Sequence, residues 1–117
     1  MVNLKKITKI LKALADESRI RIVALLKERN VLCVCEITEI IGLSQPTISS
    51  HLKKLQDAEV ITYSKDGLWV NYNLDENMEK EVKQLLGAVV RILSEDERIK
   101  SDVLKSYKIN REMICKK

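Results

Sequence analysis

Residues 31–55, VLCVCEITEIIGLSQPTISSHLKKL, decide the fold of this 117-residue chain. The pattern predicts a short helix that ends at Ile41 and is closed by Gly42 in the left-handed conformation. Ser44 then caps a second helix, and Pro46 occupies its first turn, where the missing N–H does no harm. The core-facing stripe of the second helix is Ile48, Leu52 and Leu55. A short helix, a turn and a capped helix in this order are typical of a helix–turn–helix.

Two amphipathic helices are predicted on the N-terminal side of this segment. Apolar residues at helical spacing, with lysines between them, predict the first over Leu4–Leu14. Asp16 is the candidate N-cap of the second, which ends near residues 28–30. The apolar stripe of the second helix is Ile20, Val23 and Ala24, with Leu26 as a further candidate.

On the C-terminal side the hydrophobic period changes from helical to alternating. Residues 60–64 (VITYS) and 68–74 (LWVNYNL) are rich in β-branched and aromatic side chains. The sequence Lys-Asp-Gly at residues 65–67 separates the two runs. Asp-Gly in such a position predicts a β-hairpin.

A long helix capped by Asp75 is expected after the hairpin. Its apolar stripe is Val82, Leu85, Leu86, Val89, Val90 and Leu93. After a break at residues 94–98, a last helix is expected to carry Ile99, Val103, Leu104 and Tyr107. The order of elements predicts a mainly α winged helix–turn–helix (α-α-α-α-β-β-α) with a small β-hairpin wing. We expect one domain over residues 1–110 and a flexible tail over residues 111–117.

The composition indicates a globular protein that works in the cytoplasm. Apolar residues make up 45% and charged residues 32%, and no apolar run approaches the roughly 20 residues of a membrane span. Lysines interrupt the apolar N-terminal residues, so no signal peptide is predicted. The net charge of +4 favours a polyanionic partner, although a lysine-rich solvated surface explains it equally well. An enzyme is disfavoured, because we find a single His, no Gly-rich phosphate loop and no nucleophile–base pair.

The outer face of the second helix of the helix–turn–helix predicts a DNA-binding surface. Its side chains are short hydrogen-bonding groups that suit base edges in a major groove, and no acid precedes Asp57 on this helix. The candidates for base edges or nearby phosphates are Ser44, Gln45, Thr47, Ser49 and Ser50. Lys53 and Lys54 would add non-specific attraction, and Lys65 in the hairpin would reach flanking DNA backbone; simple solvation is the alternative for each lysine. A buried or half-buried His51 that is hydrogen-bonded to the backbone is as consistent with the sequence as a DNA contact.

Cys33 and Cys35 stand one residue apart where the short helix is expected to begin. Cytoplasmic thiols stay reduced, so the pair suits a soft metal ion, a sensor or buried packing better than a disulfide. In a regular helix, side chains at i and i+2 point about 200° apart, whereas in an extended chain they share one face. One ion therefore requires an extended or distorted backbone between the two sulfurs. Such binding would pull on the first helix of the helix–turn–helix and oppose DNA binding.

Four motifs resemble the ArsR/SmtB family of metal- and metalloid-responsive repressors. They are LADESRIRIVALLKE (residues 14–28), VLCVCEI (31–37), GLSQPTISSHLKKL (42–55) and GLWVNYNL (67–74). The resemblance implies a homodimeric repressor that leaves its operator DNA on binding an inducer, with residues 4–14 and 82–93 at the dimer interface. Glu59 departs from the family, which commonly has Gly after the recognition helix. A positive φ at this residue would cost about 1 kcal/mol.

The motif LCVC followed by an acid resembles the arsenic-sensing branch of the family, and also the branch that senses cadmium and lead. The resemblance implies As(III) or Sb(III) as the inducer bound by Cys33 and Cys35, with Cd(II) or Pb(II) as alternatives and no cofactor for DNA binding. Arsenic sensors commonly have a third Cys where this chain has Thr38. Cys115 is the remaining candidate for a third ligand, from either subunit. The zinc site of the family requires imidazoles, and residues 78–97 contain none.

Two alternatives to ion sensing remain open from the sequence. The same thiols could form a disulfide or react with an oxidant or a sulfur signal, in a redox-responsive repressor. The protein could also be an architectural DNA-binding protein without any sensing role. For Cys115, an unstructured tail thiol is the alternative to a third ligand.

Overall fold

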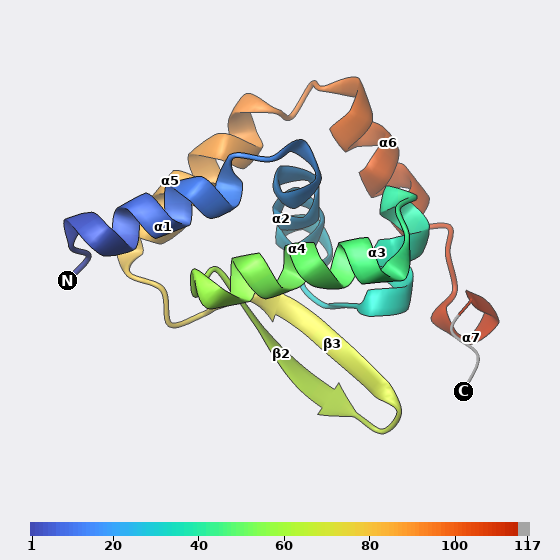
Figure 1. Ribbon diagram of the computed structural model, residues 1–117. Helices are drawn as coiled ribbons and strands as arrows, with labels where there is room; N and C mark the ends of the chain where they lie inside the picture. Colours follow the sequence, from blue (N-terminus) through green and yellow to red (C-terminus); the bar gives the residue numbers. More distant parts are fainter. Residues whose placement is uncertain (115–117) are drawn as a thin grey trace.

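The computed structural model describes residues 1–114 and has the expected winged helix–turn–helix architecture (Figure 1). In chain order the elements are α1 (Leu4–Leu14), α2 (Glu17–Arg29), β1 (Leu32–Cys33), α3 (Val34–Ile41), α4 (Gln45–Asp57), β2 (Ile61–Asp66), β3 (Trp69–Leu74), α5 (Lys80–Ile92), α6 (Glu97–Ser106) and α7 (Arg111–Ile114). Helices α3 and α4 form the helix–turn–helix. The β2–β3 hairpin, hereafter the wing, extends away from the helical body. Across residues 1–114, every helix is too short or too polar to cross a lipid bilayer.

Helix α2 is the centre of the hydrophobic core. Residues 22–26 are all buried, because α2 packs against α1, α3, α4, α5 and α6 as well as β3. A helix surrounded in this way needs apolar side chains around most of its circumference. The narrower stripe expected from the sequence is the pattern of a surface helix, and Ile20 on that stripe is only half-buried.

A three-stranded antiparallel sheet of order β1-β3-β2 connects the helices to the wing. The sequence did not predict β1, because two residues are too few to show an alternating pattern. Its residues pair with the middle of β3, Leu32 with Tyr72 and Cys33 with Asn71. Cys33, the residue directly before the helix–turn–helix, is therefore extended and held in the sheet.

The predicted hairpin is confirmed, with a turn at Gly67 and Leu68. Strand β2 runs to Asp66, which pairs with Trp69, and Gly67 has a φ of 63°. Lys65 consequently lies in β2 close to the turn, and its side chain is exposed.

The predicted N-caps of α2 and α4 are present in the structure. Asp16 accepts a hydrogen bond from the Arg19 N–H at 3.1 Å, and Ser44 Oγ accepts one from the Thr47 N–H at 3.4 Å. Gly42 closes α3 with a φ of 83°. These local signals fix the ends of the helix–turn–helix.

The prediction that Asp75 caps the long helix is wrong. Helix α5 begins at Lys80, with Glu79 at the N-cap position. The Asp75 N–H donates to the Val60 carbonyl oxygen at 3.0 Å, and its carboxylate accepts from the Asn77 N–H at 2.8 Å. Asp75 therefore extends the end of the sheet and closes a local turn, a use of Asp that competes with helix capping.

The C-terminal segment is more ordered than the sequence indicates. Helix α6 packs against α2 and α3, and the short helix α7 covers Arg111–Ile114, within the segment expected to be a flexible tail. The prediction for Cys115 as a third ligand falls outside the described residues.

Glu59 adopts the left-handed conformation, in which the usual Gly of the family would be unstrained. Its φ is 61°, and its N–H donates to the Gln56 carbonyl oxygen at 2.9 Å, just after α4 ends at Asp57. A residue with a Cβ atom is strained in this conformation, which is why Gly is favoured after helices. This chain carries the strain in the turn between α4 and the wing.

Glu59→Gly should therefore raise the free energy of unfolding by about 1 kcal/mol, because Gly adopts a positive φ without strain. Urea unfolding at fixed protein concentration measures the change. Glu76→Gly is the matched control: Glu76 is also an exposed turn residue, but without a positive φ, so its replacement should leave stability unchanged or lower it. A stability of Glu59→Gly at or below that of the control would contradict the strain.

Candidate DNA-binding surface and thiol site

Helix α4 presents the predicted DNA-contacting residues on its outer face. All six of them are exposed, whereas the apolar stripe on the opposite side of the helix is buried. The exposed residues are Ser44, Gln45, Thr47, Ser49, Ser50 and Lys53. The helix thus offers uncharged donors and acceptors at its N-terminal half and positive charge further along.

Ser44, at the N-cap of α4, has a structural role, and Lys53 forms an exposed ion pair with Asp57 at 3.5 Å. The Ser44 hydroxyl caps the helix and lies 2.9 Å from the Thr47 hydroxyl. Within residues 1–114, the exposed side chains of Gln45, Ser49 and Ser50 make no hydrogen bond of this kind. The free side chains of the helix are therefore better placed to contact bases than the cap itself, which suits a phosphate.

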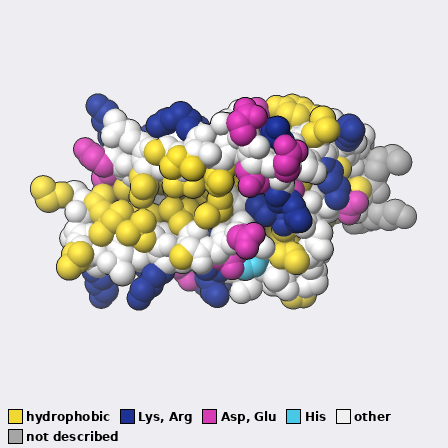
Figure 2. Space-filling model, turned by 90° about the horizontal axis from the view of Figure 1, so that it is seen from above, with side chains coloured by type: hydrophobic (Ala, Val, Ile, Leu, Met, Phe, Trp, Pro, Cys, Tyr) yellow, Lys and Arg dark blue, Asp and Glu magenta, His cyan; other side chains and the backbone are white. Residues whose placement is uncertain are grey.

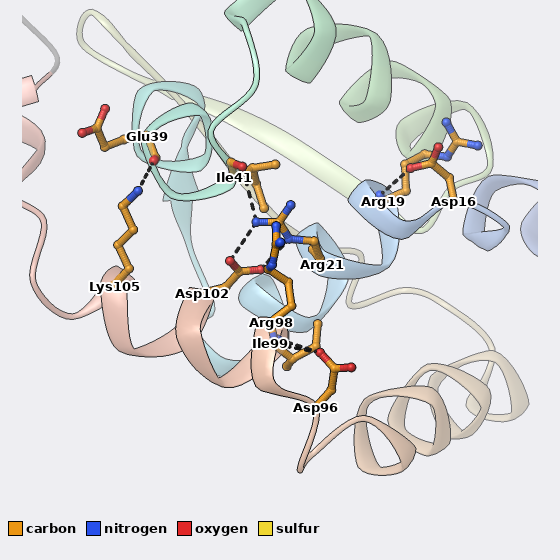
Figure 3. Close-up of polar contacts among 10 residues, drawn as sticks. All are labelled: Asp16, Arg19, Arg21, Glu39, Ile41, Asp96, Arg98, Ile99, Asp102 and Lys105. Carbon is orange, nitrogen blue, oxygen red and sulfur yellow. Dashed lines mark hydrogen bonds and ion pairs between the residues drawn. The ribbon is translucent and has the colours of Figure 1, made fainter.

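His51 joins α4 to the corner between α1 and α2. Its Nδ1 lies 3.1 Å from Arg19 Nη1, and the same guanidinium donates to the Ala13 carbonyl oxygen at 2.6 Å. Arg19 lies in the first turn of α2, and its N–H donates to the N-cap Asp16 (Figure 3). Because a guanidinium only donates, Nδ1 must accept and the ring proton is assigned to Nε2. The sequence allowed a His51 that is hydrogen-bonded to the backbone. In the structure its partner is instead the side chain of Arg19.

Cys33 and Cys35 lie at the junction between β1 and α3. Cys33 is buried, has extended backbone angles (φ −85°, ψ 164°) and occupies the N-cap position of α3. Cys35 is half-buried in the first helical turn, since the helix begins at Val34. The backbone is thus extended at Cys33 and helical from Val34 on, so the two cysteines lie on either side of a change of conformation, next to α4, which contacts α3.

Glu36 completes the capping arrangement at this junction. Its Oε1 accepts the Cys33 N–H at 2.9 Å, while the Cys33 side chain faces the Glu36 N–H. The Arg111 guanidinium lies 2.9 Å from the same carboxylate oxygen. Burial opposes ionisation of Glu36, but the Cys33 N–H and Arg111 outweigh it and lower its pKa. The spacing Cys-x-x-Glu resembles a capping box and could have revealed Glu36; no sequence signal pointed to Arg111.

The surroundings of both thiols favour the protonated form. Burial raises the pKa of Cys33, and burial followed by the adjacent Cys33 thiol raises the pKa of Cys35. The influence of one thiol on the other indicates that the two sulfurs are neighbours. Redox-sensing cysteines have the opposite properties, a low pKa and an exposed sulfur.

The donor set of this junction is a pair of soft ligands. Within residues 1–114 there is no group of three or more His, Cys, Asp or Glu side chains arranged for a metal ion. Two sulfurs suit an ion that accepts few soft ligands and completes its shell with a small molecule. The pair does not suit a hard cation such as Mg²⁺ or Ca²⁺, which needs six or more oxygen ligands.

Comparison with known proteins identifies the family. The model of the "Bacterial regulatory protein, arsR family" matches residues 16–63, which include α2, the thiol junction and the helix–turn–helix. The arsenical resistance operon repressor of Bacillus subtilis is 42% identical over 83 residues, 71% of this chain and 76% of that protein. The fold also resembles the solved structure of HlyU from Vibrio cholerae, with a TM-score of 0.68 and 31% identity over 78% of this chain and 95% of that chain.

Two further relatives carry names of resistance regulators. The arsenic resistance transcriptional regulator ArsR1 of Pseudomonas putida is 40% identical over 69% of this chain and 63% of that protein. A cadmium resistance transcriptional regulatory protein of Staphylococcus aureus, a CadC homolog, is 39% identical over 68% of this chain and 64% of that protein. The match thus spans slightly less than two thirds of these two relatives. The relatives are transcriptional regulators, not enzymes, and this chain belongs to the arsR family of bacterial regulatory proteins.

Proposed function

We propose that this protein is a cytoplasmic transcriptional repressor that a soft metalloid, As(III) or Sb(III), releases from its operator DNA. The observation that carries the proposal is the position of the thiol pair, at the N-cap and in the first turn of α3. Helix α3 packs against the recognition helix α4, so a change at the thiols acts directly on the DNA-binding unit. The names of the arsenic-resistance relatives support this choice of inducer.

Capture of arsenic changes the bonding at the start of α3. When arsenous acid reacts with both thiols, two As–S bonds form, two As–O bonds break, and the two thiol protons leave with the hydroxyl groups as two waters. Arsenic remains trivalent, and one hydroxyl group stays as the third ligand unless Cys115 replaces it. The Cys33 sulfur then no longer serves as the N-cap of α3, and coupling arises because DNA binding requires the capped arrangement.

The DNA-binding surface consists of α4 and the wing. In this proposal Gln45, Thr47, Ser49 and Ser50 contact base edges or nearby phosphates, and the capped helix start at Ser44 receives a phosphate. Lys53 on α4 and Lys65 on the wing supply charge for the DNA backbone.

A homodimer places two such surfaces on successive turns of DNA. Figure 2 shows hydrophobic side chains gathered on the face over α1 and α5. Leu4, Leu11 and Ile92 from these helices are 82%, 49% and 78% exposed. An apolar surface of this kind on a small monomer marks an interaction site, so we assign it to the second subunit.

Cd(II) or Pb(II) is the alternative inducer, and a redox signal is the alternative mechanism. The cadmium-resistance relative favours the first alternative, since it shares 39% of matched residues with this chain. The burial and raised pKa of both thiols disfavour the second.

Gln45→Ala and Ser49→Ala should each weaken operator binding by about 1–3 kcal/mol and relax the sequence preference, if these side chains contact bases. Fluorescence anisotropy with a selected operator and with random DNA measures both effects. Lys53→Ala is the control: it should weaken both complexes alike and lower the salt dependence by about one phosphate contact. Equal weakening on both DNAs by the Gln45 and Ser49 variants would remove these residues from base recognition.

Cys33→Ser should bind the operator normally but lose release by sodium arsenite. Serine is a good N-cap, so the variant keeps the start of α3 while removing the soft ligand. Titration of the reduced protein on its operator with As(III), Sb(III), Cd(II), Pb(II) and Zn(II) in turn identifies the inducer. Cys115→Ser, tested alongside, measures the contribution of the proposed third ligand. Normal release of Cys33→Ser by the active ion would exclude the pair as the sensor.

The thiols should react slowly with iodoacetamide at pH 7, and faster as the pH rises. Only the thiolate reacts, and a raised pKa lowers the thiolate fraction at a given pH. The rate should therefore climb about tenfold per pH unit and should still be rising when the pH passes the usual thiol pKa of about 8.5. Mass spectrometry of the reduced Cys115→Ser protein follows the reaction at Cys33 and Cys35 alone. A rate that is already constant below pH 7 would reveal reactive thiolates and favour the redox alternative.

A further inference from the structure

The Arg111 side chain joins groups on two elements. Its Nη2 donates to Glu36 Oε1 at 2.9 Å and to Asn71 Oδ1 at 3.1 Å. The guanidinium also lies 4.1 Å from the centre of the Trp69 ring. Arg111 begins α7, Glu36 lies in the first turn of α3, and the other two residues are in β3. One side chain thus links the C-terminal segment, the thiol helix and the wing.

The partners of Arg111 connect the thiol site to the wing. The Glu36 carboxylate accepts the Cys33 N–H, and Asn71 pairs with Cys33 across the sheet. Trp69 is the first residue of β3 and lies next to the turn of the wing. A continuous series of contacts therefore runs from the Cys33 backbone through Glu36 and Arg111 to the wing.

The contact between Arg111 and Glu36 is partly shielded from water. The two side chains are only 23% and 13% exposed. Charge-assisted hydrogen bonds and cation–π contacts are stronger when desolvated than at an open surface. The three contacts of Arg111 are thus able to hold the wing in a defined position relative to α3.

Helices α2 and α6 hold the other end of α3. Arg21 donates to the Ile41 carbonyl oxygen at 3.3 Å and forms a buried ion pair with Asp102 at 2.7 Å, and Lys105 donates to the Glu39 carbonyl oxygen at 2.8 Å (Figure 3). A change in the first turn of α3 is therefore not absorbed by a shift of the whole helix. It acts on the groups that contact the first turn.

We propose that Arg111 is a positioning residue that couples ion capture at Cys33 and Cys35 to the wing. An ion that binds both sulfurs takes the Cys33 sulfur from its capping position and turns its N–H away from Glu36. The carboxylate then no longer holds Arg111 against Trp69 and Asn71, and the wing loses its position for DNA. This inference rests on the proposed function and adds the route by which capture reaches the wing.

The test compares operator affinity with and without sodium arsenite for the reduced full chain. Arg111→Met keeps much of the apolar stem but removes the donors and the charge, Arg111→Lys keeps the charge without the planar fork, and Lys108→Ala is an exposed control in the same segment. The quantity compared is the operator Kd with arsenite divided by the operator Kd without it. This ratio should fall on the order of tenfold in Arg111→Met relative to wild type, because the ion-free variant already binds the operator weakly. The ratio should stay unchanged in Lys108→Ala and be intermediate in Arg111→Lys. Arsenite should still bind Arg111→Met with unchanged stoichiometry.

Trp69 supplies a second readout, because it is the only tryptophan in the chain. Its emission should change when arsenite binds the wild type, and ion-free Arg111→Met should already show the changed emission. Glu36→Gln, which keeps an oxygen for the Cys33 N–H but loses the charge facing Arg111, should behave in the same way and replaces Arg111→Met if that variant does not fold.

The outcomes separate this inference from the proposed function. A wild-type Kd ratio together with an arsenite-dependent change of Trp69 emission in Arg111→Met, or in Glu36→Gln in its place, would overturn the role of Arg111 and leave the thiol sensor intact. A wild type that neither binds arsenite nor leaves the operator would overturn both. A Cys33→Ser protein that stays on the operator, beside an Arg111→Met protein whose operator affinity is already low without arsenite and changes little when arsenite binds, would support both.

Discussion

The N-cap of α3 is the constraint on which the rest of this structure depends. A single residue, Cys33, pairs with Asn71 in the sheet, caps the first helix of the helix–turn–helix and carries one of the two candidate ligands. Its backbone cannot be extended for the sheet and helical for α3 at the same time, so the helix must begin at the next residue. Any chemistry at this sulfur therefore acts on the sheet and on the helix–turn–helix together.

The local signals of the sequence were sufficient for most of the fold. Gly42, Ser44 and the Asp-Gly pair in the hairpin each fix a conformation through their own backbone or side chain, and the structure has all three features. The helix-cap prediction for Asp75 was wrong because an Asp carboxylate can either close a turn or cap a helix. Only the hydrogen bond from the Asp75 N–H to the end of the sheet decides between the two roles.

The parts that the sequence did not predict depend on distant contacts. Strand β1 exists only because β3, some forty residues later in the chain, supplies its partner. Arg111 lies 75 residues from Glu36 in the chain, and nothing in the sequence near Arg111 indicates that its side chain contacts a carboxylate. For the candidate site, the cysteines and the exposed side chains of α4 were found from residue type and spacing. Their environment, which decides protonation and coupling, required the packed structure.

The size of the coupling can be compared with the contacts available to carry it. Allosteric coupling between two sites is typically about 1–3 kcal/mol. A hydrogen bond to a charged group contributes about 1.5–3 kcal/mol, so the loss of one such contact is enough to account for release from DNA. With α3 eight residues long and held by α2 and α6 at its C-terminal end, its first turn is the part free to respond. The proposed sensor at that turn needs no large motion, because replacing the cap by an ion would by itself change the contact that is proposed to position the wing.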